Sequence, residues 1–377
     1  MTTAIDPVDL ALRLIACPSV TPVDAGAIGI ISDALQSIGF QVHRFRDGSA
    51  PDGPIENLFA TRGCGAPHFA FAGHSDVVPA GDGWATHPFK PEIRGELLYG
   101  RGAVDMKGAI AAFISAASQV TDHPGTVSLI ITGDEEGPAT HGTVALIDWM
   151  KSNNIRPDMC VVGEPTSVRR LGDTLKIGRR GSVNLWIDNP GVQGHVAYPH
   201  LAENPVPGLV AALAALVALQ LDDGNAWFQP SNLEITTIDV GNTATNIIPA
   251  HARARINIRF NDEHSGADLV EMVRALVADH APRAEVRAVI SGESFLTEPG
   301  ELSALVSAAI GHVTGLTPEL STSGGTSDAR FLSKLCPVIK FGLCNATMHK
   351  LDEAVAVADL YALADIYKAI TRSALGF

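Results

Sequence analysis

Histidine and carboxylate side chains that could bind metal ions follow several apolar segments of this chain. The seven candidates are His74 and Asp76 in FAFAGHSD, Asp105 in GRGAVDMKG, Glu135 and Glu136 in LIITGDEEG, Glu164 in VVGEPTS and His349 in NATMHK. Imidazole and carboxylate groups without thiolates are a usual ligand set of catalytic zinc sites. Two divalent ions that share one carboxylate need five such side chains, which are supplied by His74, Asp105, Glu136, Glu164 and His349.

The two remaining carboxylates have other predicted roles. Glu135 and Glu136 are adjacent, so their side chains diverge in an extended chain, and one can bind metal while the other acts as general base. Asp76 lies two residues beyond His74, on the same side of an extended strand, where it can orient the imidazole. Each motif alone could also be a polar turn, a solvated acidic loop or a helix cap. Their coincidence at several strand ends favours the metal site.

Regular elements must bring these distant residues together. Apolar runs predict buried strands at residues 69–72, 127–132, 159–162 and 338–341. Amphipathic or small-residue segments predict helices at residues 10–15, 28–38, 106–120, 143–151, 302–314 and 359–375. The alternation indicates an α/β fold, with a mainly parallel sheet and helices on both faces. Such sheets bind ligands beyond the carboxyl ends of their strands, where the candidate metal ligands stand.

The middle of the chain has a different pattern. Strands are predicted at residues 183–187, 233–240, 253–260 and 284–290, and helices at residues 205–221 and 267–279. Their order, β-α-β-β-α-β, is that of a ferredoxin-like α+β domain. We therefore expect a catalytic domain made of residues 1–177 and 293–377, interrupted by a lid or dimerisation domain of residues 178–292.

Composition narrows the classes of partner. The formal net charge of −14 argues against nucleic acid and anionic membranes, although local basic residues can still bind a small anionic substrate. The five cysteines form no C-x-x-C pair, and no apolar stretch is long enough to span a membrane. The first residues lack the basic start and apolar core of a signal peptide. We therefore expect a cytoplasmic protein.

The chain resembles the M20 family of dinuclear zinc amidohydrolases and peptidases, over essentially its whole length. The motifs GHSDVVPAGDGW, LYGRGAVDMKG, TGDEEG and VVGEPT carry the resemblance, in this order. It implies two zinc ions per subunit, for which cobalt can substitute, in a zinc-peptidase-like catalytic domain. One ion would be bound by His74, Asp105 and Glu164. The other would be bound by Asp105, Glu136 and His349, so that Asp105 bridges the pair.

The same resemblance assigns roles to the residues around the metal. Glu135 would be the general acid and base, and Asp76 would orient His74. The peptide bond between Asp105 and Met106 would be cis. The family also implies that the lid mediates a homodimer, and that some lid residues act across it.

Further motifs concern the substrate. KIGRRGSVN, GHVAYPHLAENPV, SGGTSDARF and NATMHK resemble family members that hydrolyse the amide of N-succinyl-L,L-2,6-diaminopimelate, a step toward lysine and the cell wall. Guanidinium groups suit the carboxylates of such a substrate, and a lid histidine suits a developing oxyanion. The implied substrate contacts are Lys176, Arg179, Tyr198, Asn246, Arg259, Gly325, Thr326 and Asn345, with His195 as a catalytic residue from the lid.

Two alternatives stay open. The same chemistry could act on another N-acyl amino acid, such as N-acetylornithine. The chain could also be a non-catalytic metal-binding protein of this fold, although the presence of Glu135 argues against that. A serine or cysteine nucleophile is disfavoured, because the sequence has no G-x-S-x-G elbow.

Overall fold

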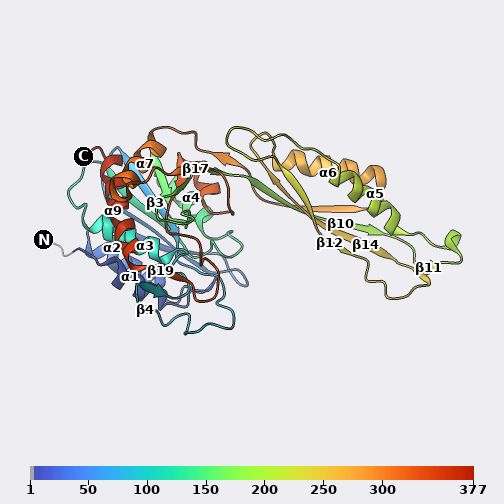
Figure 1. Cartoon of the computed structure of the whole chain (residues 1–377), viewed down its shortest axis with the longest axis horizontal. Helices are drawn as coiled ribbons and strands as arrows, with labels where there is room; N and C mark the ends of the chain where they lie inside the picture. Colours follow the sequence, from blue (N-terminus) through green and yellow to red (C-terminus); the bar gives the residue numbers. More distant parts are fainter. Residues whose placement is uncertain (1–3) are drawn as a thin grey trace. The chain divides into compact units, whose positions relative to one another are not determined.

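The computed structural model describes residues 4–377, which divide into two compact units (Figure 1). The first unit comprises the chain up to Ile177, Thr297–Ser321 and Ser327–Phe377, and the second comprises Gly178–Leu296 and Thr322–Thr326. The first boundary thus falls where the sequence suggested it, and the second lies four residues beyond residue 292. Whether each unit is a domain that folds by itself stays a prediction. Residues 1–3, part of the segment assessed for a signal peptide, lie outside the described chain.

An eight-stranded sheet forms the centre of the first unit. Its order is β1 (Gln41–Asp47), β2 (Ile55–Gly63), β6 (Thr126–Thr132), β3 (His68–His74), β7 (Met159–Val162), β18 (Val338–Lys340), β8 (Thr174–Lys176) and β17 (Glu319–Ser321). The four central strands, β6, β3, β7 and β18, are parallel, whereas β1 and β2 extend the sheet in antiparallel fashion. The predicted α/β fold with a mainly parallel sheet is confirmed.

Helices pack against this sheet and against one another. They are α1 (Pro7–Ile15), α2 (Ala27–Ser37), α3 (Lys107–Ser118), α4 (Thr143–Ser152), α7 (Glu301–Thr314), α8 (Ala329–Leu332) and α9 (Val357–Ala374). Every residue of α3 is buried, because its sequence KGAIAAFISAAS is rich in small side chains that let neighbours approach closely. A small sheet of β4 (Glu92–Arg94), β5 (Leu97–Tyr99) and β19 (Ala354–Ala356) lies beside them. Within residues 4–377, no helix has both the length and the apolar character that a bilayer span requires.

The second unit has the predicted order of elements. The strands β10 (Gly181–Pro190), β12 (Asn232–Asp239), β14 (His251–Phe260) and β15 (Glu285–Gly292) form an antiparallel sheet in the order β12-β14-β10-β15. Alternate residues of β10 and β14 are buried, together with apolar residues of α5 (Pro205–Val217) and α6 (Gly266–His280). The two helices therefore cover one face of the sheet.

Short elements extend both ends of this sheet. At one end, β11 (Gly194–His195) pairs with β13 (Ile247–Ile248), and a 3-10 helix, Pro199–Leu201, follows. At the other end, β9 (Gly178–Arg179) pairs with β16 (Phe295–Leu296). Figure 1 shows β11 beyond the end of the four main strands. The unit therefore presents two distinct ends, about one strand length apart.

We expect Phe113→Ala to destabilise the first unit by about 3–5 kcal/mol, because the ring is fully buried and its loss leaves a cavity. Phe113 stacks on Phe71 with ring centroids 4.2 Å apart and meets the edge of Tyr367 at 5.7 Å. Urea unfolding of the metal-free protein measures the change. The matched control is Phe377→Ala, at a ring that is 42% exposed, where about 1 kcal/mol or less is expected. Equal losses in both variants would contradict this account of the core.

Candidate metal centre

The parallel strands deliver five of the seven candidate residues to one edge of the sheet. β3 ends at His74, and Asp76 follows two residues later. β6 ends at Thr132, just before Glu135 and Glu136, and β7 ends at Val162, just before Glu164. These strands are neighbours in the sheet and run in the same direction, so their carboxyl ends meet.

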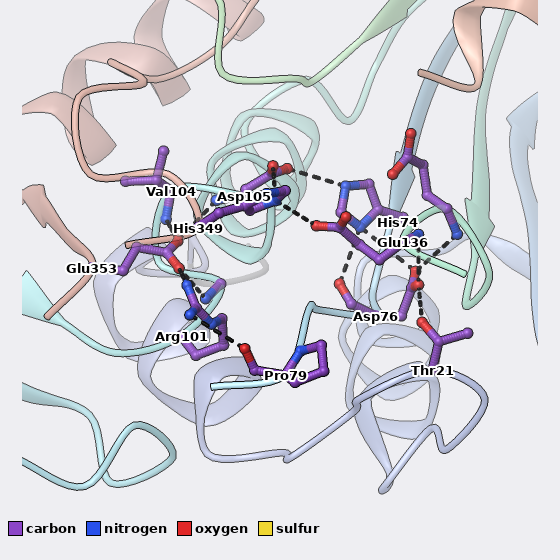
Figure 2. Close-up of polar contacts among 12 residues, drawn as sticks. Thr21, His74, Asp76, Pro79, Arg101, Val104, Asp105, Glu136, His349 and Glu353 are labelled. Carbon is purple, nitrogen blue, oxygen red and sulfur yellow. Dashed lines mark hydrogen bonds and ion pairs between the residues drawn. The ribbon is translucent and has the colours of Figure 1, made fainter. Parts of the chain in front are cut away.

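Four side chains form a continuous chain of contacts at this edge (Figure 2). The Nε2 atom of His74 lies 3.1 Å from Oδ1 of Asp105. Oδ2 of Asp105 lies 3.1 Å from Nε2 of His349, and the same nitrogen lies 2.8 Å from Oε1 of Glu136. Ligand atoms of His74, Asp105 and Glu136 all lie within 4.8 Å of one another. The site thus joins the end of β3, the loop before α3, the loop after β6 and the segment after β18.

Asp76 contacts both His74 and the backbone of the two adjacent glutamates. Its carboxylate accepts hydrogen bonds from the backbone N–H groups of Glu135 at 3.3 Å and Glu136 at 3.0 Å, and from the hydroxyl of Thr21. The Nδ1 atom of His74 lies 3.0 Å from the backbone oxygen of Asp76 and 3.6 Å from its Oδ1. Asp76 thus meets the imidazole through its backbone oxygen and fixes the backbone of both glutamates through its carboxylate, whereas its predicted role in orienting His74 stays a prediction.

Burial and like charges act on the two remaining carboxylates. Burial raises the pKa of Glu164 to about 7, and the negative charge of Asp105 adds to the effect. Burial and the charge of Glu164 raise the pKa of Glu135 well above its usual value. The Oε1 atom of Glu164 is buried and has no hydrogen-bond partner within residues 4–377. A buried carboxylate oxygen without a hydrogen-bond donor is suited to bind a cation.

The histidines respond in the opposite direction. Contacts with the carboxylates of Asp105 and Glu136 raise the pKa of His349 to about 10. Burial would lower the pKa of His74, but its contacts with Asp105 and Asp76 raise it well above the ordinary value. Burial would raise the pKa of Asp105, but both histidines lower it. Each imidazole thus holds a proton where a divalent cation would bind between nitrogen and oxygen, so the residues fit a metal centre.

Three residues beside the cluster were not singled out in the sequence. Glu353 accepts hydrogen bonds from the loop that carries Asp105, and Arg101 pairs with Glu353. Asp328 accepts a hydrogen bond from the hydroxyl of Thr143, and burial raises its pKa to about 6. Arg101 and Asp328 stand inside the motifs LYGRGAVDMKG and SGGTSDARF, which were the available signals. The Asp105–Met106 peptide is cis, as expected.

Two of the predicted substrate contacts belong to the first unit. The ammonium of Lys176, at the end of β8, donates to the hydroxyl of Ser321 at 3.1 Å. The backbone N–H of Asn345 donates to the carbonyl of Ser167 at 2.9 Å, so the loop that leads to His349 is tied to the segment after Glu164. Neither contact involves a substrate, and both assignments stay predictions.

The other predicted substrate contacts belong to the second unit and fall into separate groups. His195 and Tyr198 lie with their ring centroids 5.8 Å apart, and the backbone N–H of Val196 donates to the carbonyl of Asn246 at 3.1 Å. These residues sit beyond the start of β14, whereas Arg259 lies near its end. Arg179, in β9, belongs to the same end as Arg259. Gly325 and Thr326 lie in the Thr322–Thr326 segment.

Comparison with known proteins agrees with this architecture. The chain is 78% identical over 371 residues to a succinyl-diaminopimelate desuccinylase of Rhizorhabdus wittichii, with 98% of each chain covered. It is 61% identical over 376 residues to a protein of the same name from Zymomonas mobilis, with 100% of each covered.

Solved structures share the fold. The aminopeptidase PepT of Bacillus cereus superposes with a TM-score of 0.80 at 20% identity, covering 99% of each chain. The YXEP protein of Bacillus subtilis, described as a dinuclear metal-binding peptidase of the M20 family, gives 0.73 at 15% identity, covering 98% of this chain and 97% of that one. Residues 70–373 match the sequence profile of peptidase family M20/M25/M40, which is well over half of the chain. The chain therefore belongs to peptidase family M20/M25/M40.

Proposed function

We propose that this protein is a zinc-dependent hydrolase of N-succinyl-L,L-2,6-diaminopimelate, which it cleaves into succinate and L,L-2,6-diaminopimelate. The observation that carries the proposal is the contact chain His74–Asp105–His349–Glu136, with Glu135 beside it. The names of relatives that are 61–78% identical over the whole chain support the substrate. We further propose that the enzyme acts as a cytoplasmic homodimer.

The proposed metal ligands keep the assignment that the family resemblance implies. One ion would be held by His74, Asp105 and Glu164, and the other by Asp105, Glu136 and His349. Nitrogen and carboxylate donors without sulfur fit zinc, and cobalt is accepted by similar sets. When bound, zinc ions acidify a water molecule and polarise the carbonyl of the amide.

Glu135 carries the proton in this proposal. Its raised pKa suits a group that must first accept a proton from water and then donate it to the leaving nitrogen. Its backbone N–H donates to the carboxylate of Asp76, which fixes the backbone at this residue. His195 would stabilise the oxyanion of the tetrahedral intermediate, and Asp76 keeps His74 in its ligating orientation.

The arginines suit a substrate with several carboxylates. Arg179 and Arg259 offer planar groups that bind carboxylates through two hydrogen bonds, and Lys176 adds a positive charge. The group of His195, Tyr198 and Asn246 lies at the opposite end of β14. The eight residue steps from His251 to Arg259 span about 26 Å, which is longer than an acyl amino acid.

This separation supports the homodimer. A single small substrate cannot contact both ends of the same second unit. If Arg259 and His195 both serve one active site, the two residues must come from different copies of the chain. Each site of a symmetric dimer would then be completed by its partner.

A substrate panel tests the proposed reaction. We expect the zinc-loaded protein to hydrolyse N-succinyl-L,L-2,6-diaminopimelate with a higher kcat/KM than N-acetylornithine, because the arginines favour the additional carboxylates. Release of free amine measures both reactions, before and after removal of metal by a chelator. A higher kcat/KM for N-acetylornithine would show that the proposed substrate is wrong, while the proposed metal-dependent amide hydrolysis would stand. If none of the N-acyl amino acids in the panel is hydrolysed, a non-catalytic metal-binding protein is favoured.

Removal of the proposed base should separate catalysis from metal binding. We expect Glu135→Gln to lower kcat by about 10²–10⁴-fold, because the amide cannot accept the proton of water, while the bound metal stays unchanged. Steady-state kinetics and metal analysis give the two quantities. Glu96→Gln, the same change at an exposed glutamate of the first unit, is the control and should retain full activity. Full activity of the Glu135→Gln variant would remove Glu135 from its assigned role.

Complementation tests whether His195 acts across the dimer. His195→Ala and Glu135→Gln are each expected to be nearly inactive alone. After mixing and subunit exchange, a heterodimer should regain one site, which combines Glu135 from one copy with His195 from the other. Random pairing would restore about a quarter of the wild-type activity. If both residues act in the same copy, mixing restores none.

A further inference from the structure

Arg101 and Glu353 form an ion pair inside the first unit, close to the candidate metal centre but outside its ligand set. The Nη1 atom of Arg101 lies 2.7 Å from Oε2 of Glu353, and the two side chains are 2% and 0% exposed. The residues are separated by 252 positions in the sequence. Buried ion pairs cost desolvation energy, so a pair in this position calls for a reason beyond stability.

Glu353 fixes the loop that carries Asp105. Besides Arg101, its carboxylate accepts hydrogen bonds from the backbone N–H groups of Gly102 at 3.0 Å, Val104 at 2.8 Å and Asp105 at 3.1 Å. Figure 2 shows Glu353 between Arg101 and the segment of Val104 and Asp105. The last of these bonds is made by the residue that would bridge the two ions. A shift of the Glu353 carboxylate would therefore move Asp105.

Arg101 ties two further loops to the same point. Its guanidinium donates to the carbonyl of Lys350 at 3.2 Å and to the carbonyl of Ala80 at 3.1 Å. Lys350 follows His349, whose φ of +61° is a left-handed conformation that is uncommon for residues other than glycine. The loop that contains Ala80 begins after Asp76. The pair thus connects the segments of His74, Asp105 and His349.

We propose that Arg101 and Glu353 are positioning residues that hold Asp105 and His349 in their metal-binding arrangement. The inference rests on the metal centre of the proposed function, but on no property of the substrate. Both residues act through the backbone: Glu353 through the N–H of Asp105, and Arg101 through the carbonyl that follows His349. Loss of the pair should therefore lower the affinity for metal, even in a protein that stays folded.

Glu353→Gln is the main test, because it keeps the size of the side chain. Both carboxylate oxygens accept backbone N–H groups, so either orientation of the amide turns an NH2 group toward a donor. We expect the dissociation constant for Co²⁺, titrated into metal-free protein, to rise about 10–100-fold. The visible absorption bands of bound Co²⁺ should shift, because the ligand geometry changes. Glu96→Gln is the matched control and should bind Co²⁺ like the wild type.

Stability measurements separate positioning from a merely structural role. Both roles lower the unfolding temperature of the metal-free Glu353→Gln variant. Only positioning changes the Co²⁺ affinity and spectrum at a temperature where circular dichroism shows a folded protein. A folded Glu353→Gln variant with wild-type affinity and an unchanged spectrum would overturn the proposal.

Arg101→Lys keeps the inference testable if Glu353→Gln does not fold. A lysine can retain the ion pair with Glu353, but a single ammonium cannot also reach the carbonyls of Ala80 and Lys350. We expect a rise in the Co²⁺ dissociation constant that is smaller than for Glu353→Gln, and an unchanged constant would overturn the proposal. Wild-type protein that binds Co²⁺ yet does not cleave the succinyl substrate would refute only the proposed function.

Discussion

Five carboxylates converge at the carboxyl edge of the central sheet, and their mutual repulsion is the constraint on which the site depends. Asp76, Asp105, Glu135, Glu136 and Glu164 face two imidazoles. In a partly buried place, carboxylates of this density stay ionised only where a positive charge or a hydrogen-bond donor meets them. The pKa values of Asp76 and Asp105 are lowered, because donors and imidazoles contact these carboxylates. The pKa values of Glu135 and Glu164 are raised, because burial and neighbouring negative charges dominate there. Divalent cations would balance the remaining negative charge of the cluster.

The surrounding fold can be understood as the means of holding these charges apart and aligned. Parallel strands bring the ligands together, but every candidate ligand except His74 lies beyond the end of its strand, where a loop would let the side chains spread. The backbone N–H groups after β6 are therefore bound by Asp76, and those before α3 by Glu353. Both anchors are carboxylates whose negative charge is held by donors. The same kind of group thus serves as ligand, base and support, and its neighbours decide which.

The sequence predicts the parts of this design that are local. An apolar run such as FAFAGH predicts β3, and the metal-binding residue types that follow such runs predict the site. Both predictions succeed because the end of a strand is a local property of the sequence. Strand β1 was missed, since its sequence QVHRFRD is polar and largely exposed at the edge of the sheet. Strand β2 was missed as well, although most of its residues are buried. The helix predicted at residues 205–221 ends at Val217 in the structure. The prediction was too long because apolar residues continue past the last turn of the helix. The link between Arg101 and Glu353 crosses 252 positions, and no local pattern announces it.

Chemistry and specificity are divided within the chain. The first unit contains every candidate metal ligand, and this set would suit many amides. Discrimination must therefore come from groups that recognise the rest of the substrate. In the second unit the predicted substrate contacts lie at the two ends of a ten-residue strand, too far apart to meet one small molecule. Any arrangement that uses both ends in one reaction requires a second copy of the chain, so the recognition of substrate would depend on assembly while the binding of metal would not.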